Sequence, residues 1–271
     1  MACAVSGGAD SSALLVLACA AGCDATAHHV DHGIRPDTER EPTMVAALAD
    51  RFGAGFVAHT AQVGPGPNLE ARARQARFAL LPEDIVTGHT LDDRAETMLL
   101  NLVRGAARKG LSPLRSSQRH PLVRLRRADT VELCERLEID VVNDPSNDDP
   151  SFRRNRVRHE LLPLLNDISQ RDVVALLDRQ ADIFADEDSL LDALAAEIDP
   201  TDAKAVAEAP RPLARRALRN FICQEWDLGH PPGVAAVERA LQVASGTATA
   251  CDLEGGHRIH RTHQKLRVLP P

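Results

Sequence analysis

The first residues that could carry out chemistry follow a short apolar segment, 2–5, and read Ser6-Gly7-Gly8-Ala9-Asp10-Ser11. Adjacent glycines let a backbone turn sharply, so that its N–H groups come close to a bound anion. The apolar residues 13–21 favour a helix, whose first N–H groups and dipole attract the same anion. Serine hydroxyls add donors, and Asp10 could hold a hydrated divalent cation against a polyphosphate. The segment therefore predicts phosphate binding in preference to an ordinary capped turn.

Two carboxylates further along form a second candidate site. Asp93 and Glu96 are three residues apart in a predicted helix over 91–103, which places both side chains on one helical face. Acids in a first turn also interact favourably with the helix dipole, by about 0.3–1 kcal/mol. The position of this pair directly after a predicted strand favours a site that receives a cation over that purely structural role.

The elements that must position these residues alternate through the first 100 residues. Apolar runs predict strands at 2–5, 25–30, 55–59 and 84–87. Helical periodicity is found over 11–21, 38–52, 69–80 and 91–103. Such alternation predicts a Rossmann-like α/β fold, a parallel sheet with helices on both faces. Ligands of these sheets bind outside the carboxyl ends of the strands, a rule that gathers 6–11, 29–35 and 88–93 at one edge.

One of these strand ends carries His29-Val30-Asp31-His32, with His28 and His89 as neighbours. Histidines and a carboxylate can bind zinc. Side chains alternate in direction along a strand, however, so these residues do not all converge. We therefore expect Asp31 and His32 to line a nucleotide and acceptor pocket, with a zinc site as the less favoured alternative.

Positive charge is concentrated in the middle of a chain whose net charge is −7. Residues 101–127 contain eight arginines and lysines and no acid. An unbroken basic run beside a nucleotide edge predicts a polyanionic partner, although a solvated surface is the usual reason for a charge run. The cations of this run and of a second cluster are Arg104, Arg108, Lys109, Arg115, Arg119, Arg124, Arg126 and Arg127, then Arg153, Arg154, Arg156 and Arg158.

Two domains are expected, 1–166 and 167–271. Residues 181–203 contain eight acids and no base, which favours a solvated linking helix around 168–198. Prolines near a first turn predict helices over 212–226 and 232–244, and the weakly alternating tail is consistent with two short strands. The second domain is therefore predicted to be smaller, mainly helical, and to bind tRNA or substrate.

Composition restricts the class of protein further. The six cysteines have no C-x-x-C or zinc spacing and are expected to be free thiols. The longest apolar run, 13–23, is too short to span a membrane. The N-terminus lacks the basic region of a signal peptide, so a cytoplasmic location without membrane contact is expected.

The loop at 6–11 matches the S-G-G-x-D-S motif of the N-type ATP pyrophosphatases, or PP-loop enzymes. Later segments resemble successive motifs of the tRNA(Ile)-lysidine synthetases over about residues 2–165. They are His29-Val30-Asp31-His32-Gly33-Ile34-Arg35, Asn68-Leu69-Glu70 with Arg74 and Arg77, Gly88-His89-Thr90-Leu91-Asp92-Asp93-Arg94-Ala95-Glu96-Thr97, Arg104-Gly105, and Asp144-x-Ser146-Asn147-x-Asp149-x-x-Phe152-x-Arg154-Asn155-x-x-Arg158.

The resemblance implies an enzyme that uses ATP to modify the wobble cytidine of the isoleucine tRNA with a CAU anticodon. ATP adenylates the cytosine, and L-lysine then displaces AMP, with pyrophosphate released in the first step. The loop 6–11 would bind pyrophosphate with Mg²⁺ on Asp10, and Asp93 and Glu96 would hold the lysine. The remaining implied residues are Asp31, His32, Arg35 and Arg104 in the reaction site, and Arg108, Lys109, Arg124, Arg126, Arg127, Arg154 and Arg158 on tRNA. A homodimer is left open.

The chain departs from this family after Arg104-Gly105, where a glycine- and hydroxyl-rich segment is usual and Ala106-Ala107-Arg108-Lys109 stands instead. No nucleotide contact is expected there. A tRNA thiolase of the PP-loop class is an alternative, but the cytidine-thiolating kind carries C-x-x-C pairs that this chain lacks. A regulatory nucleotide-binding domain without chemistry is the other alternative, and the polar motifs at the strand ends argue against it.

Overall fold

The apolar segments near the N-terminus pair as a parallel sheet in the computed structural model of the protein, which describes residues 1–31, 40–61, 76, 79–114, 117–142, 147–225 and 230–270. The strands are β1 (Ala2–Ala4), β2 (Thr26–Asp31), β3 (Gly55–Thr60) and β4 (Val86–Thr87), in the order β3-β2-β1-β4. All three pairings are parallel. The predicted α/β fold is confirmed, while the predicted helix over 69–80 lies almost wholly outside the described residues.

The strand order reverses at β1. The chain proceeds outward from β1 to β3 and then crosses back to place β4 on the other side of β1. In open α/β sheets this reversal creates the crevice in which ligands bind, at the carboxyl ends of the two strands that flank it. The helices that follow these strands are α1 (Ala9–Ala20) and α4 (Leu91–Val103), so both helices begin at that edge.

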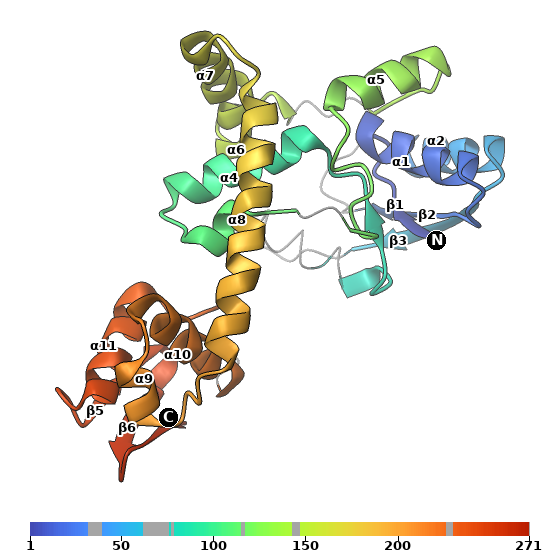
Figure 1. The fold of residues 1–271 in the computed structure, drawn as a ribbon. Helices are drawn as coiled ribbons and strands as arrows, with labels where there is room; N and C mark the ends of the chain where they lie inside the picture. The colour runs from blue at the N-terminus through green and yellow to red at the C-terminus, as the bar shows by residue number, and fades with distance from the viewer. Residues whose placement is uncertain are drawn as a thin grey trace. The chain divides into compact units, whose positions relative to one another are not determined.

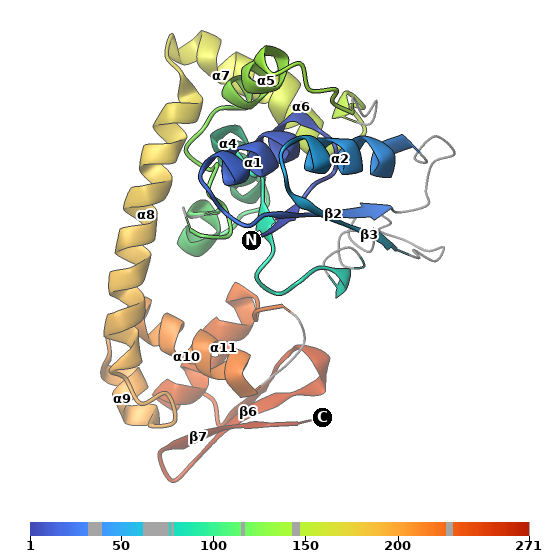
Figure 2. The ribbon, with the colours of Figure 1, turned by 90° about the vertical axis from the view of Figure 1, so that its right-hand side faces the viewer.

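Helix α1 is apolar around most of its circumference, and the sheet, α2 and α5 cover it. Its residues 12–16 and Ala18 are buried. Helices α1 and α2 (Arg40–Arg51) lie side by side along one face of the sheet (Figures 1 and 2). Helix α5 (Arg127–Arg136) packs on α1, through Cys134 among others. The sequence did not predict α5, because only Thr130 and Cys134 of this helix are buried and no apolar period results.

A second group of helices packs around α4 (Figure 1). It consists of η1 (Arg108–Leu111), α6 (Arg153–Arg156), the π-helix η3 (Val157–Leu161), α7 (Leu162–Ser169) and the first turns of α8 (Val173–Ala196). Their shared core includes Ala95 and Leu99 of α4, Val157, Leu162 and Val174. This packing fixes the orientation of α4 and therefore of its polar side chains.

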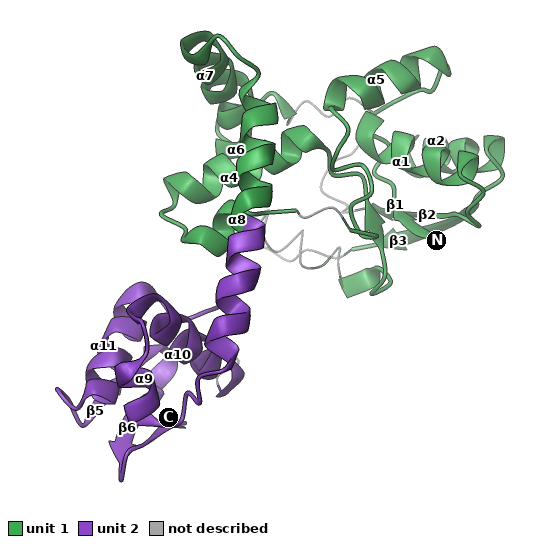
Figure 3. Ribbon diagram, in the orientation of Figure 1, with its two compact units in different colours: residues 1–184 green, residues 185–271 purple. Residues whose placement is uncertain are grey.

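The chain divides into two compact units, Met1–Phe184 and Ala185–Pro271 (Figure 3). The division falls within α8, whereas the sequence predicted a boundary between residues 166 and 167. The first turns of α8 belong to the first unit because Val173 and Val174 pack in the core of α4. Among the described residues, no helix is long and apolar enough to cross a membrane.

The described part of the second unit combines the last turns of α8 and three further helices with a small sheet. The helices are α9 (Ala203–Glu208), α10 (Arg211–Glu225) and α11 (Val234–Ser245). The antiparallel strands are β5 (Ala250–Asp252), β6 (Arg258–Thr262) and β7 (Lys265–Leu269), with the short turn η4 (Glu254–Gly256) between the first two. Leu218, Ile222, Val243, Ile259 and Leu266 form the centre of its core. The tail thus contains three strands where two were expected.

The close approach of the end of β4 to the first turn of α1 gives a first prediction, for Gly88→Ala. A Cβ at Gly88 would lie 2.6 Å from the carbonyl oxygen and 2.9 Å from the carbonyl carbon of Asp10, both backbone atoms. The strand end and α1 must then separate, and overpacking of this kind typically costs about 1–3 kcal/mol. We expect a loss of unfolding free energy in that range, measured by urea denaturation.

Gly8→Ala is the matched control. A Cβ at Gly8 would have only Ser6 Oγ within 4 Å, at 3.9 Å, and the φ angle of Gly8 is −73°. Equal losses of stability in the two variants would contradict the inferred contact between Gly88 and Asp10.

Candidate active site

The loop at 6–11 is closed by hydrogen bonds onto Ser11. The Ser11 hydroxyl donates to the Gly8 carbonyl oxygen at 2.9 Å and accepts from the Ser6 N–H at 3.1 Å. Gly7 has a φ of +88°, a conformation that side chains disfavour, and its carbonyl oxygen accepts from Val142 N–H at 2.9 Å. Gly8 is the N-cap of α1 and provides no side-chain cap. The first N–H groups of α1 are thus left for an anion.

The carboxylates of Asp93 and Glu96 are held on one face of α4, as their spacing predicts. Asp93 Oδ2 accepts from the N–H and the hydroxyl of Thr90, at 2.8 and 3.0 Å, and so caps the helix. Glu96 is fully buried. Two arginines each donate to both acids: Arg127 at 2.8 Å to Asp93 and 3.0 Å to Glu96, and Arg154 at 2.8 and 2.7 Å.

Two further contacts complete this cluster. Arg158 Nε donates to Glu96 Oε1 at 2.7 Å. Arg127 Nε also donates to Asp10 Oδ2 at 3.2 Å, which links the loop on α1 to the acids on α4. Three carboxylates thus face three guanidinium groups, and we call Arg127, Arg154 and Arg158 the arginine cage. Buried ions need this pairing, because desolvation of an uncompensated charge is expensive.

The electrostatics differ between the two helices. Burial acts to raise the pKa of Asp93, but Arg127 and Arg154 bring it below its ordinary value. Burial raises the pKa of Asp10, which the hydroxyl of Thr130 and Arg127 offset only in part. Burial acts to lower the pKa of Arg127, but the three acids raise it well above its ordinary value. The charge of the Asp10 carboxylate is therefore less fully compensated by its neighbours than that of Asp93.

A sequence profile of the PP-loop domain matches residues 1–165. The chain is 36% identical to a tRNA(Ile)-lysidine synthase of Nocardia farcinica, over 98% of this chain and 87% of that protein. It is 37% identical to the tRNA(Ile)-lysidine synthase of Rhodococcus opacus, over 81% of this chain and 72% of that protein. The chain belongs to the tRNA(Ile)-lysidine synthase family.

A solved structure supports the fold independently. The U34-tRNA thiolase NcsA from Methanococcus maripaludis, with its [4Fe-4S] cluster, matches with a TM-score of 0.53 at 19% identity. The match covers 67% of this chain and 70% of the thiolase chain. At this identity the likeness concerns the PP-loop fold alone, and the predicted family membership of the chain is confirmed by its closer sequence relatives.

In this member of the lysidine synthase family the C-terminal part of the basic run, from Arg124 to Arg127, is paired with acids. Arg124 donates to Asp178 and Asp182 of α8, at 2.7 Å to each. Arg126 contacts Asp92 at 3.1 Å and Asp172 at 2.5 Å. The absence of acids within 101–127 does not mean that its cations are unpaired, because α4, α8 and the turn before α8 supply the acids. The same holds for Arg154 and Arg158 in the arginine cage, and tRNA binding by these five arginines, Arg127 included, remains a prediction.

The position of this segment follows from its hydrogen bonds to the sheet edge. The Thr87 N–H donates to the carbonyl oxygen of Arg119 at 2.9 Å, and the Leu91 N–H donates to the carbonyl oxygen of Leu125 at 2.8 Å. Residues 119–125 thus run beside the end of β4 and the start of α4. This brings Arg127 to the acids of α4, a role that no sequence motif indicated.

The other predicted cations lie at the far end of α4. Arg104 is the exposed C-cap, eight positions from Glu96, or about 12 Å at 1.5 Å per residue. Arg108 lies over the ring of Phe184 at 5.3 Å, and Lys109 is exposed. The structure therefore does not bring Arg104 to the arginine cage. Asp31 ends β2, while His32 and Arg35, with Arg74, Arg77, Asp144 and Ser146, lie outside the described residues.

The histidines form pairs in place of a metal cluster. His28 Nδ1 and His59 Nε2 are 3.0 Å apart, and their rings stack. The Thr87 hydroxyl lies 2.6 Å from His89 Nδ1 and 2.8 Å from His120 Nδ1. Within the described ranges, no group of three or more potential metal-ligating side chains is found. The zinc alternative therefore has no support there.

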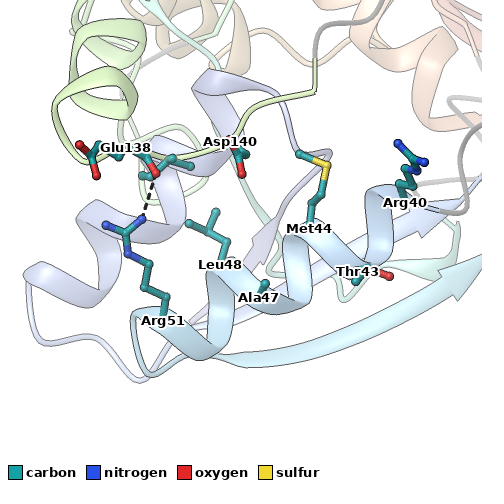
Figure 4. A pocket seen from close by; sticks show the side chains of 9 residues that line it. Arg40, Thr43, Met44, Ala47, Leu48, Arg51, Glu138 and Asp140 are labelled. Atoms are coloured by element: carbon teal, nitrogen blue, oxygen red, sulfur yellow. Dashed lines mark hydrogen bonds between the residues drawn. The ribbon is translucent and has the colours of Figure 1, made fainter.

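A separate pocket of about 470 Å³ lies between α2 and residues 138–140 (Figure 4). Its floor is apolar, with Met44 and Leu48 at its centre, and Arg51 at one end donates to the Glu138 carbonyl oxygen at 3.2 Å. No residue of the loop 6–11 or of the arginine cage lines it. This pocket and the candidate chemistry are therefore distinct.

Thr130 is a site residue that the sequence analysis missed. Its hydroxyl donates to Asp10 Oδ1, and its side chain is buried at the start of α5. A lone threonine in an unpredicted helix carries no signal of its own. Helix α5 thus supplies two partners of the loop carboxylate, Thr130 and Arg127.

Proposed function

We propose that this chain ligates L-lysine to the wobble cytidine of the CAU-anticodon isoleucine tRNA, through an adenylated tRNA intermediate. The observation that carries the proposal is the pair of carboxylates, Asp93 and Glu96, placed one helical turn apart and joined through Arg127 to the loop at the start of α1. A polyphosphate and an amino acid would then bind at adjacent helix starts of one sheet edge.

The loop fits the triphosphate of ATP. The N-cap of α1 is a glycine without a side-chain cap, and the space before it admits a Cβ with no contact shorter than 3.9 Å. Backbone N–H donors and the helix dipole would bind the phosphates. Asp10 would hold Mg²⁺, which would supply charge neutralisation to the phosphates when bound. The raised pKa of Asp10 is consistent with a carboxylate that gains from such a cation.

The reaction has two steps. The cytosine O2 attacks the α-phosphorus of ATP, so that an O–P bond forms and pyrophosphate leaves. The ε-amine of lysine then attacks C2 of the activated base, a C–N bond forms, the C–O bond to AMP breaks, and the amine loses its protons to the medium. Asp93 and Glu96 would hold the other ammonium group of lysine, and the loop would retain the phosphates. Formation of a C–N bond at the expense of ATP is ligase chemistry. We also propose that the second unit contributes to binding of the tRNA.

Pyrophosphate release tests the proposal directly. Purified full-length protein with ATP, Mg²⁺, L-lysine and the CAU-anticodon isoleucine tRNA should release pyrophosphate and AMP and incorporate labelled lysine into the tRNA. A tRNA whose wobble cytidine is replaced by uridine is the matched control and should accept no lysine. Pyrophosphate release without lysine incorporation would favour another PP-loop modification, and no turnover with any tRNA would favour a regulatory domain.

The exposed cations give a prediction for tRNA affinity. Among the described residues Lys109 forms no ion pair, so Lys109→Ala should weaken tRNA binding and reduce its salt dependence. Each phosphate contact contributes a slope of roughly 0.9 in log K against log salt for a duplex. Arg136→Ala is the control, because Arg136 is exposed and paired with Glu132 at 2.5 Å. The slope is measured by filter binding from 50 to 200 mM salt. An unchanged slope in Lys109→Ala would show that Lys109 does not contact a tRNA phosphate.

A further inference from the structure

The acceptor atoms of Asp93 and Glu96 are fully occupied in the structure. Asp93 accepts four hydrogen bonds, two from Thr90, one from Arg127 and one from Arg154. Glu96 also accepts four, one from Arg127, one from Arg154 and two from Arg158. An ionised carboxylate offers about four lone-pair positions. An ammonium group can therefore reach these acids only if a present donor leaves.

Arg127 is the donor best placed to leave. Its departure would free one acceptor position on each acid, and it alone in the arginine cage also contacts the loop, at Asp10. Its backbone N–H donates to Asp92 Oδ2 at 2.7 Å, so the start of α5 stays anchored while the side chain moves. The Arg127 side chain is 25% exposed and that of Arg154 is 35% exposed, so exposure permits either to move, and the contact with Asp10 distinguishes Arg127. A polyphosphate on the loop would offer it a stronger partner than Asp10.

We propose that Arg127 is a placeholder cation. It occupies the position on Asp93 and Glu96 at which lysine binds, until ATP binds at the loop and the guanidinium moves to its phosphates. This inference rests on the proposed function and adds an order to it, nucleotide before amino acid. The exchange conserves charge, because an ammonium replaces a guanidinium beside two buried carboxylates. It also conserves hydrogen bonds to the acids, because Arg127 vacates two acceptor positions and an ammonium can fill both with two of its three donors. Arg127 acts here as a positioning residue.

Lysine binding should then be coupled to nucleotide binding. Calorimetry on the full chain would titrate L-lysine with and without Mg²⁺ and an ATP analogue whose α,β bridge is a methylene. The wild-type protein should bind lysine about tenfold more tightly with the analogue, within the usual range of coupling between sites. By reciprocity, lysine should tighten analogue binding by the same factor.

Replacement of Arg127 should abolish this coupling. In Arg127→Gln the acids lose their competitor, so lysine affinity without nucleotide should rise to within about threefold of its affinity with nucleotide. Arg127→Lys keeps the charge, but one ammonium cannot span three carboxylates, so the coupling should shrink at least threefold. Arg136→Gln on the same helix is the control and should retain wild-type coupling.

The outcomes separate the inference from the proposed function. Lysine binding by the wild type that is equally tight with and without nucleotide would overturn the inference and leave lysine as the substrate. Full coupling in folded Arg127→Gln or Arg127→Lys would overturn it as well. If the wild type binds no lysine in either condition, the proposed function fails together with the inference. If the Arg127 variants do not fold, the wild-type titrations with and without the nucleotide analogue still test whether nucleotide binding promotes lysine binding.

Discussion

Glu96→Gln is expected to destabilise the first unit strongly and to abolish lysine binding. Glu96 is fully buried and accepts from Arg127, Arg154 and Arg158, so a neutral amide leaves a buried excess of positive charge. Removal of one partner from a buried ionic cluster costs about 3–5 kcal/mol. Urea denaturation should show a loss of this size.

The control for this prediction is Glu132→Gln. Glu132 is exposed and contacts only Arg136, and exposed pairs of this kind contribute at most about 1 kcal/mol. A Glu96→Gln protein as stable as the Glu132→Gln protein would show that the cage does not hold the charge of Glu96.

Asp93→Asn tests lysine binding with part of the helix cap retained, because an amide oxygen can still accept the hydrogen bonds from Thr90, while the contacts with Arg127 and Arg154 are weakened. Its lysine KM should rise at least tenfold, equivalent to about 1.4 kcal/mol, while its ATP KM changes far less. Single-turnover kinetics should follow formation of adenylated tRNA separately from its reaction with lysine. Loss of adenylation with unchanged lysine dependence would assign Asp93 to ATP or Mg²⁺ instead.

Asp10→Ala and Ser11→Ala are expected to leave a folded protein that uses ATP poorly. Asp10 contacts Arg127 and Thr130, and the Ser11 hydroxyl closes the loop onto Gly8. Each lost charge-assisted or loop-closing contact should weaken ATP binding by about 1.5–3 kcal/mol. Equilibrium ATP binding and pyrophosphate turnover measure the loss, with circular dichroism to check the fold.

Ser169→Ala is the matched control for Ser11→Ala, because the Ser169 hydroxyl is exposed and contacts only backbone carbonyl oxygens at the end of α7. It should keep wild-type ATP affinity. If Asp10→Ala and Ser11→Ala also keep wild-type affinity and turnover, the loop at 6–11 does not bind the nucleotide.

Local patterns in the sequence determined the scaffold of the site. The glycines at 7 and 8 after an apolar strand predicted the loop, because backbone turning and helix initiation depend on neighbouring residues only. The spacing of Asp93 and Glu96 predicted a shared face, because the helical period relates them directly, and the predicted helix over 91–103 has the bounds of α4. Strand alternation likewise predicted the parallel sheet and the edge on which these elements meet.

The pairing of charges was decided by tertiary structure alone. Arg94, one residue from Asp93, is almost fully buried and contacts Asp178 and, at 2.7 Å, Asp182. Nothing in the sequence of α4 distinguishes this arginine from an exposed one. Arg124 of the basic run binds the same two acids, so a segment that reads as a polyanion surface is also joined to α8 by ion pairs.

The physical reason is that an ion pair depends on the distance between groups that the chain brings together from far apart in sequence. Arg127 and Asp10 are 117 residues apart, and Arg127 lies in a helix that apolar periodicity did not reveal. Sequence patterns report the number and sign of charges, but their compensation depends on burial and neighbours. The sequence alone therefore determined the loop, the carboxylate pair and the fold that carries them, while the tertiary structure decided which cations close the site.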